Sequence, residues 1–378
     1  MKKTKVLFIA ESLNIGGAEK ALISLLSNID YSLYDVTLYL ISRCGGFAEL
    51  PSCIANLKYR YFVSPNRSSI GRLVDMVKIK SAYHWLSPTL FGNYLCNGYD
   101  TVVAFCEGYL TKWVAAASVS CNKIAWVHTD MVENDWPVSS GVFASVKAES
   151  EAYKKFDEVV AVSNIVARGL TQKLGLKNIT TIYNMLDSDI VSKSQEEIAY
   201  YPSRKLNLIS VGRLETVKGY SVLIDAVNIL ANDKKLDVSL CLVGYGSQYE
   251  NLKKKVEYLS LSDRVHLAGA QENPYPYVAK SDVYICSSLK EGFNIAVLEA
   301  MSLGKPVIAT ASAGPIEILD EGSFGILVDN NTDALVSAIE YLYGNDAELE
   351  RLSYLSLSRV KDFDSTKQIK KIHKLICR

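Results

Sequence analysis

The amino-acid sequence predicts an α/β protein with two doubly wound domains, each a parallel sheet covered by helices on both faces. Short apolar runs, typical of buried strands, alternate along the chain with amphipathic helical stretches. Two such alternating series are separated by a polar stretch that has no apolar periodicity. A chain of 378 residues is also too long for one ordinary core and suits two domains of roughly 150 to 200 residues.

Composition limits the class of protein. The chain is 49% hydrophobic and 22% charged with zero formal net charge, which indicates a globular protein and disfavours a general nucleic-acid binder. Its eight cysteines form no CxxC pair and no metal-ligand spacing, so we expect reduced thiols and no metal site. The first apolar run is about five residues, too short for a signal peptide, and no run reaches the roughly 20 residues of a membrane span. We therefore predict a cytoplasmic protein.

The first series opens with an apolar run, a loop ending in Gly16-Gly17 and an amphipathic helix. A glycine pair lets a ligand approach the backbone, and the helix N-terminus behind it favours an anion; a tight turn is the alternative. Further strands are expected at 35–41, 57–63, 101–106, 123–128, 158–163 and 178–183. Residues at the carboxyl ends of these strands are the candidate site residues of this domain, because those ends meet at one edge of the sheet. They are Glu11, Gly17, Glu107, His128 and Ser163.

We place the first domain at residues 1–186, the linker at 187–204 and the second domain at 205–362. Strands of the second series are expected at 206–212, 238–244, 264–269, 283–286, 306–310 and 325–328. The last part of the chain is helical, with a break around Asp362 to Asp364. Tandem doubly wound domains favour a ligand cleft between them.

The stretch 287–310 carries two carboxylates, Glu291 in a glycine-containing loop and Glu299 within an apolar helical run. If Asn294 caps that helix, the amides after it offer an anion site. A carboxylate among apolar neighbours needs a partner, so a capping or buried-pair role is the structural alternative for Glu299.

Three further loops follow strands of the second domain. After Gly212, Arg213 and Lys218 can converge on a diphosphate, the Arg bidentately and the Lys as a compact charge; surface solvation is the alternative for either. Gly244 lies in a GxG that lacks the third glycine of a dinucleotide fingerprint. Ala270 and Gln271 follow another strand at the same edge, where backbone can bind a nucleobase.

These motifs together resemble the retaining GT-B glycosyltransferases of the family-4 type. The segments are GGAEK, VGRLETVKG, LVGYG, VHLAG and EGFNIAVLEAMSLGKPVIAT, and Glu291 and Glu299 match the family's E-x7-E signature. The resemblance covers essentially the full length. It implies two Rossmann-like domains facing across a deep cleft, an acceptor-binding first domain, a nucleotide-sugar-binding second domain, and a helix at 363–378 that crosses back to the first.

The resemblance also implies residue roles. Glu299 would hold the ribose hydroxyls, Glu291 the hydroxyls of the transferred sugar, and Arg213 and Lys218 the diphosphate. His128 would lie near the donor sugar, although a histidine ending a strand and bonded to backbone is the alternative. The implied donor-binding residues are Gly16, Gly17, Gly212, Gly244, Ala270, Gln271, Gly292, Phe293, Asn294, Ile295 and Glu299.

The resemblance implies a retaining transfer of a sugar from a nucleoside diphosphate sugar. The donor is expected to be a UDP-sugar, because most members of the family use one. The acceptor is expected to be a saccharide or lipid-linked oligosaccharide in surface polysaccharide or capsule synthesis. Because cationic side chains can neutralise the diphosphate, we expect no essential metal and no other cofactor. A UDP-sugar epimerase of the same fold and a catalytically silent sugar-nucleotide-binding subunit of a synthase complex are the alternatives.

Residues 58–90 form a basic segment. It holds Lys58, Arg60, Arg67, Arg72, Lys78 and Lys80 against the single acid Asp75, with tyrosines and Trp85 interleaved. Such a segment can rest on an anionic membrane surface, so we expect peripheral binding to the inner face of the plasma membrane. A solvated helical face is the alternative.

Overall fold

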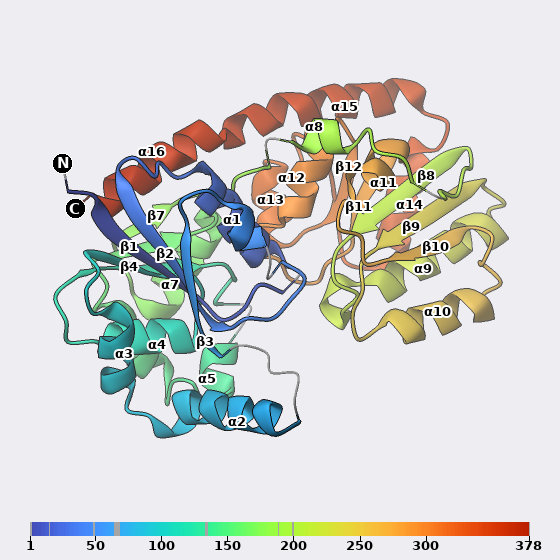
Figure 1. The fold of residues 1–378 in the computed structure, drawn as a ribbon. Coiled ribbons are helices and arrows are strands. Elements are labelled where there is room, and N and C mark those ends of the chain that lie inside the picture. Colours follow the sequence, from blue (N-terminus) through green and yellow to red (C-terminus); the bar gives the residue numbers. More distant parts are fainter. Residues whose placement is uncertain are drawn as a thin grey trace. The chain divides into compact units, whose positions relative to one another are not determined.

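The computed structural model describes residues 2–14, 16–47, 50–63, 69–132, 135–187, 189–198 and 200–377. The chain forms two compact units, Met1–Met185 with Ser365–Arg378, and Leu186–Asp364 (Figure 1). Each unit is a parallel sheet with helices packed on its faces.

The first unit contains a seven-stranded parallel sheet in the order β3-β2-β1-β4-β5-β6-β7. The strands are β1 (Thr4–Ala10), β2 (Tyr34–Ser42), β3 (Lys58–Val63), β4 (Thr101–Ala104), β5 (Asn122–Val127), β6 (Glu158–Ala161) and β7 (Ile179–Thr181). Each corresponds to a predicted strand, because apolar runs such as Val6–Ile9 are buried on both faces of the sheet. The strand order reverses between β1 and β4, so the loops after these strands flank the switch point.

The helices of the first unit connect these strands. They are α1 (Gly17–Asn28), α2 (Ser69–Lys80), the π-helical turn η2 (Ser81–Trp85), α3 (Pro88–Cys96), α4 (Tyr109–Ala116), α5 (Trp136–Ser139), α6 (Val146–Tyr153), α7 (Asn164–Leu174) and α16 (Ser365–Ile376), with the 3₁₀ turn η1 (Leu50–Cys53).

The last helix, α16, is fastened to the sheet of the first unit by side chains of three strands. Thr101 Oγ1 donates to the carbonyl of Ile376 over 3.1 Å, and Asn122 Nδ2 donates to that of Leu375 over 2.8 Å. The hydroxyl of Tyr34 lies 2.8 Å from Nδ1 of His373. The bonds from Thr101 and Asn122 satisfy carbonyls in the last turn of the helix that have no partner within it.

The second unit contains a six-stranded parallel sheet in the order β10-β9-β8-β11-β12-β13. The strands are β8 (Leu206–Val211), β9 (Val238–Val243), β10 (Val265–Gly269), β11 (Val283–Cys286), β12 (Val307–Thr310) and β13 (Ile326–Val328), at the predicted positions. The order reverses between β8 and β11, which places the switch point between the loop after Val211 and the loop after Cys286.

The helices of the second unit begin with α8 (Ile190–Lys193), which forms from the polar stretch between the two series. The others are η3 (Thr216–Lys218), α9 (Tyr220–Asn228), the π-helical turn η4 (Ile229–Asp233), α10 (Tyr249–Tyr258), α11 (Tyr275–Lys280), α12 (Ile295–Ser302), α13 (Ala313–Ile318), α14 (Thr332–Leu342), α15 (Asp346–Val360) and η5 (Lys361–Phe363). The break between α15 and α16 falls where the sequence predicts it. In the part of the chain that is described, no helix combines the length and apolarity needed to cross a bilayer.

Candidate functional site

Two loops meet at the switch point of the second unit, Arg213–Gly219 after β8 and Ser287–Asn294 after β11. The N–H of Leu289 donates to the carbonyl of Val217 over 2.8 Å, and Ser287 Oγ donates to that of Lys218 over 2.8 Å. Gly219 has a φ of 67°, and a Cβ there would overlap the carbonyl oxygen of Ser287. Only glycine fits this crossing, so the two loops are held in one arrangement.

Lys218 and Glu291 form an ion pair across these loops, with Lys218 Nζ 2.5 Å from Glu291 Oε1. Their side chains are only 20% and 13% exposed. Burial lowers the pKa of Lys218, but the Glu291 carboxylate more than offsets this and leaves it above its ordinary value. The structure thus brings together two predicted site residues, which the sequence assigned to different groups of the donor.

Arg213 lies on the same loop, with an exposed side chain. In the described residues no carboxylate forms an ion pair with it. The nearby Glu215 carboxylate is held instead by the hydroxyl of Ser247 at 2.6 Å and its N–H at 3.0 Å. These bonds, with the Arg213 charge, lower the pKa of Glu215. The Arg213 guanidinium is therefore available to an anion at this edge.

The predicted glycines after β8 and β9 are explained by close backbone packing. A Cβ at Gly244 would overlap the carbonyl oxygen of Gly212, and one at Gly212 would lie 2.8 Å from the hydroxyl of Tyr220. The N–H of Gly244 donates to the carbonyl of Gly269 over 2.8 Å. Backbone packing thus requires glycine at position 244, whereas a Cβ at position 212 would need the Tyr220 side chain to move; contact with a donor stays a prediction.

Asn294 caps α12, as predicted. Its side chain accepts from the N–H of Val297 at 3.4 Å, and its own backbone has a φ of 66°. Left-handed backbone is tolerated by asparagine better than by most residues. Glu291 also anchors this turn, because its carbonyl accepts from the N–H of Gly314 at 3.1 Å. The loop of Gly292, Phe293, Asn294 and Ile295 therefore leads into the helix in a defined geometry.

Glu299 lies on α12 and is only 4% exposed. The hydroxyl of Tyr275, on α11, donates to Glu299 Oε1 over 3.2 Å. This provides a partner that a buried carboxylate needs. Nothing in the sequence pattern pointed to Tyr275, which is 24 residues away and sits in a short proline-containing helix.

Ala270 and Gln271 follow β10 as expected. Ala270 is exposed, and Gln271 Nε2 donates to the carbonyl of Ala268 over 2.7 Å. The glutamine side chain thereby closes the turn after the strand. Their contact with a nucleobase remains a prediction.

In the first unit, Glu107 holds the segment that carries His128. A single carboxylate oxygen, Glu107 Oε1, accepts from the N–H of His128 at 2.8 Å, the N–H of Thr129 at 2.6 Å and the hydroxyl of Thr129 at 2.8 Å. The carboxylate is 5% exposed. It fixes the backbone at the end of β5 and so positions the imidazole.

The side chain of His128 is half-buried with its Nε2 shielded from solvent, and loss of solvation lowers its pKa to about 3. Its Nε2 has no hydrogen-bond partner among the described residues. The ring is packed against Phe105, with centroids 4.7 Å apart. His128 is therefore neutral at physiological pH, with an unused nitrogen.

Carboxylates gather around the first strand of this unit. Burial raises the pKa of Glu11, which bonds to Tyr83 and feels the charges of Glu107 and Glu19. A Cβ at Gly16 would overlap the carboxylate of Glu19, so the start of α1 already has a negative group beside it. Ser163, another strand-end candidate, instead caps α7 by accepting from Val166 N–H at 3.1 Å.

Across the described ranges, no group of three or more His, Cys, Asp or Glu side chains is placed to hold a metal ion. That catalysis needs no essential metal remains a prediction.

Comparison with known proteins gives this geometry a context. Residues 193–356 match the family described as Glycosyl transferases group 1. Over 365 residues the chain is 26% identical to N-acetylgalactosamine-N,N'-diacetylbacillosaminyl-diphospho-undecaprenol 4-alpha-N-acetylgalactosaminyltransferase of Campylobacter jejuni, with 94% of each chain covered. It is 34% identical to lipopolysaccharide core biosynthesis glycosyltransferase LpsE of Rhizobium meliloti over 147 residues, which cover 39% of this chain and 42% of LpsE.

Solved structures agree in fold. Anabaena HepE in complex with UDP and glucose superposes with a TM-score of 0.76 over 99% of both chains, at 20% sequence identity. Sucrose-phosphate synthase of Thermosynechococcus elongatus gives a TM-score of 0.76 at 16% identity, with 99% of this chain and 98% of that one covered. The match to the family, the relatives and the two doubly wound units together identify the chain as a glycosyltransferase with the GT-B fold.

Proposed function

We propose that this glycosyltransferase moves a sugar, with retention of anomeric configuration, from a UDP-sugar to a saccharide or lipid-linked glycan in surface polysaccharide synthesis. The observation that carries the proposal is the Lys218–Glu291 pair at the switch point of the second unit, beside exposed Arg213. A nucleoside diphosphate sugar needs cations at its phosphates and a carboxylate at its sugar hydroxyls. The ion pair supplies one of each, Lys218 for the phosphates and Glu291 for the hydroxyls.

The residues of the site act on charge that develops during transfer. Cleavage of the bond between anomeric carbon and phosphate increases negative charge on the diphosphate, which Lys218 and Arg213 stabilise. Glu291, released from Lys218, accepts hydrogen bonds from sugar hydroxyls. Glu299 accepts from the ribose hydroxyls while Tyr275 holds it in place.

The environment of His128 supports a mechanism without a protein base. A group with a pKa of about 3 is a weak proton acceptor near neutral pH. The proton of the attacking hydroxyl is then taken by the departing phosphate on the same face of the sugar, which gives retention. Neutral His128 contributes a hydrogen bond near the donor.

The names of two relatives support the proposed acceptor. The Campylobacter enzyme acts on a diphospho-undecaprenol-linked saccharide, and the Rhizobium enzyme acts in lipopolysaccharide core biosynthesis. A chain that extends such acceptors works at a membrane surface, and the first unit has a surface suited to one.

This membrane-facing surface consists of α2, η2 and the start of α3. Its large apolar side chains are 41% to 71% exposed: Leu73, Val74, Met76, Val77, Trp85, Leu86 and Leu90. Lys78 and Lys80 are exposed among them. Lys58 is paired with Asp35 at 2.7 Å, while Arg67 and the side chain of Arg72 lie outside the described residues. Apolar side chains interleaved with lysines favour an anionic bilayer interface over a purely solvated face.

A donor and product assay tests the proposal. UDP-sugars should raise the thermal unfolding temperature, and a polyprenyl diphosphate-linked saccharide should then yield UDP and an α-linked product from an α-linked donor, read by NMR. Inversion at the anomeric carbon would contradict the mechanism. Interconversion of donors without an acceptor would identify an epimerase, and turnover of only GDP- or ADP-sugars would exclude the proposed donor.

A further inference from the structure

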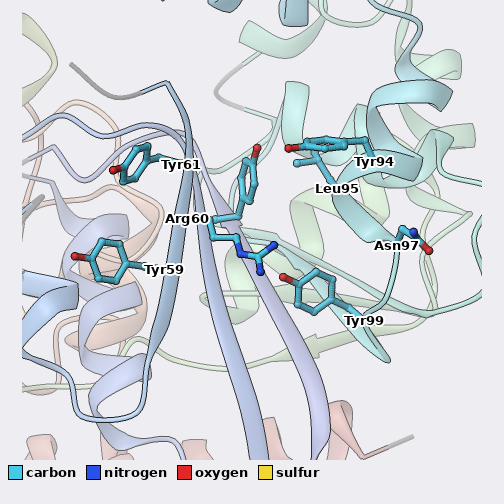
Figure 2. Close-up of a pocket in the computed structure, with 8 residues that line it drawn as sticks. Tyr59, Arg60, Tyr61, Tyr94, Leu95, Asn97 and Tyr99 are labelled. Atoms are coloured by element: carbon cyan, nitrogen blue, oxygen red, sulfur yellow. The ribbon is translucent and has the colours of Figure 1, made fainter. Parts of the chain in front are cut away.

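A tyrosine-rich pocket of about 560 Å³ lies on the first unit, away from the strand ends that carry Glu107 and His128. It is lined by Tyr39, Tyr59, Arg60, Tyr61, Tyr94, Leu95, Asn97 and Tyr99. The strands β2 and β3 form one wall, and α3 with the loop before β4 forms the other (Figure 2).

Strand pairing explains how the pocket forms. Tyr39 and Arg60 are direct neighbours across β2 and β3, so both side chains project from the same face of the sheet. Phe62, two residues further along β3, packs edge-on against Phe91 of α3 with centroids 5.2 Å apart. This contact seats α3 over the sheet and leaves the space beside Arg60 open.

Arg60 is the cation of this pocket. Figure 2 shows its guanidinium pointing toward Tyr99, away from Tyr59 and Tyr61, which lie on the other side of the β3 ribbon. Within the described part of the chain, Arg60 forms no ion pair with a carboxylate. Its charge instead acts on buried Tyr39, whose pKa is raised mainly by burial and by a hydrogen bond with Tyr94. An exposed arginine of this kind is available to an external anion.

The polar lining around Arg60 is suited to a polyhydroxylated ring. Tyr94 is 64% exposed, and Tyr99 and Asn97 are also accessible. Phenol rings offer flat apolar faces with a hydroxyl at the edge, and the Asn97 amide both donates and accepts. The volume lies within the range of small-ligand sites.

We propose that this tyrosine pocket is a glycan-binding subsite for a sugar that carries a carboxylate or phosphate. Arg60 binds the acidic group, the rings of Tyr94 and Tyr99 pack against the sugar, and Asn97 bonds to a hydroxyl. The inference rests on the proposed function in that it adds a second site for the glycan that the enzyme binds. A carboxylate and a phosphate ester share the chemistry that Arg60 recognises, and the test separates them.

Saturation-transfer NMR on the full chain tests the pocket with four probes: glucuronate, glucose 6-phosphate, glucose and inorganic phosphate. The acidic sugars should receive saturation on ring protons and bind at least about tenfold more tightly than glucose, since a charge-assisted bond contributes that much. Arg60→Gln should remove the difference between acidic and neutral sugars. Tyr94→Ala should weaken all ring contacts. Arg168→Gln, an equal charge change at an exposed position of α7, should change nothing.

Three results would overturn the proposal: equal binding of glucose and glucuronate, acidic-sugar affinity unchanged by Arg60→Gln, or binding of inorganic phosphate with no saturation of any sugar ring. UDP-glucose in a parallel sample separates the two hypotheses. If UDP-glucose binds and the acidic sugars do not, the subsite fails while the donor site stands. If the acidic sugars bind through Arg60 and no UDP-sugar binds, the subsite stands while the proposed donor fails.

Discussion

The ammonium of Lys218 lies 2.5 Å from the carboxylate of Glu291, although 73 residues separate them in the chain. The charges that the loop after β8 and the loop after β11 carry at these two residues therefore neutralise each other. Two opposite charges at low exposure are stable only as a pair, because either one alone would be poorly solvated. In the proposed function, a donor replaces this contact with phosphate at Lys218 and sugar hydroxyls at Glu291.

The first prediction concerns the stability of this pair. Lys218→Met should lower the free energy of unfolding by about 2 kcal/mol, because it leaves Glu291 partly buried and unpaired. Lys218→Met with Glu291→Gln should be less destabilising than the sum of the single changes, in urea unfolding of all four proteins. Lys218→Met should also reduce kcat more than it raises KM.

The exposed pair Lys234–Glu340 is the matched control, with side chains 38% and 46% exposed at 2.6 Å. Lys234→Met should change stability by less than about 1 kcal/mol and leave turnover intact. Strict additivity in the Lys218 cycle would show that the pair contributes no coupling. Unchanged turnover in Lys218→Met would refute its role at the diphosphate.

The second prediction concerns Tyr275 and donor affinity. Glu299→Ala should weaken UDP binding strongly, since it removes the proposed acceptor of the ribose hydroxyls. Tyr275→Phe should weaken UDP binding several-fold, because loss of the 3.2 Å bond leaves Glu299 less well positioned. Calorimetry with UDP measures both. Tyr277→Phe, a buried tyrosine of the same helix, should bind UDP normally; wild-type affinity in Tyr275→Phe would remove Tyr275 from the site.

The third prediction follows from the pKa of His128, which lies at about 3 against an ordinary value of 6.5. Below pH 6.5 this imidazole is protonated in the unfolded chain but stays neutral in the folded protein. The free energy of unfolding therefore falls as the pH falls. Between pH 6.5 and pH 5 this amounts to about 2 kcal/mol. His128→Gln should lose that part of the pH dependence in urea titrations. Identical pH profiles of wild type and variant would mean that His128 has the same pKa in the folded and the unfolded chain.

The fourth prediction concerns Glu149 on α6, whose contribution to stability falls as the pH rises, opposite to that of His128. This side chain is fully buried, neither carboxylate oxygen has a partner in the described structure, and burial raises its pKa to about 7. As pH rises from the ordinary value of 4.5, the unfolded chain loses its proton first, so stability falls up to about pH 7 and stays low above it.

Glu149→Gln imitates the protonated acid and should therefore stabilise the protein by about 3 kcal/mol at pH 8 while changing little at pH 4.5. Thermal unfolding at both pH values measures this. A variant less stable than wild type at pH 8 would show that the carboxylate is paired and charged.

The fifth prediction tests the membrane-facing surface by flotation on vesicles that contain phosphatidylglycerol. Combined Leu73→Ser, Trp85→Ser, Lys78→Gln and Lys80→Gln should abolish flotation while UDP affinity persists. Each lysine near an anionic surface contributes about 1 kcal/mol, and the apolar side chains add burial. The control on the second unit is Tyr258→Ser with Lys253→Gln and Lys254→Gln, three exposed positions of α10. Equal flotation of both multiple variants would argue against the surface.

The fold could be predicted from the sequence because parallel strands are buried on both faces and so appear as continuous apolar runs. Val283–Cys286 and Val307–Thr310 are such runs, and the switch-point loops follow from their order. The cap by Asn294 was also predictable, since capping depends on local backbone only.

Contacts between distant segments could not be predicted in this way. Three such contacts join separate elements of the fold. They are the ion pair of Lys218 with Glu291, the hydrogen bond from Tyr275 to Glu299, and the hydrogen bonds that Glu107 accepts from the segment of His128. The sequence pattern predicts Tyr39 only as a residue of a buried strand. Its position beside Arg60 follows from the register of β2 with β3. Such pairings depend on tertiary packing, on which residue periodicity carries no information.

The anchoring of α16 to the sheet of the first unit has a consequence for biosynthesis. Ribosomes release residues 186–364 before residues 365–376, so the second unit has its whole sequence available while the first still lacks a helix. Buried Leu375 and Ile376, whose carbonyls accept from Asn122 of β5 and Thr101 of β4, reach the sheet only afterwards. During translation the first unit is thus the later of the two to have its full sequence available.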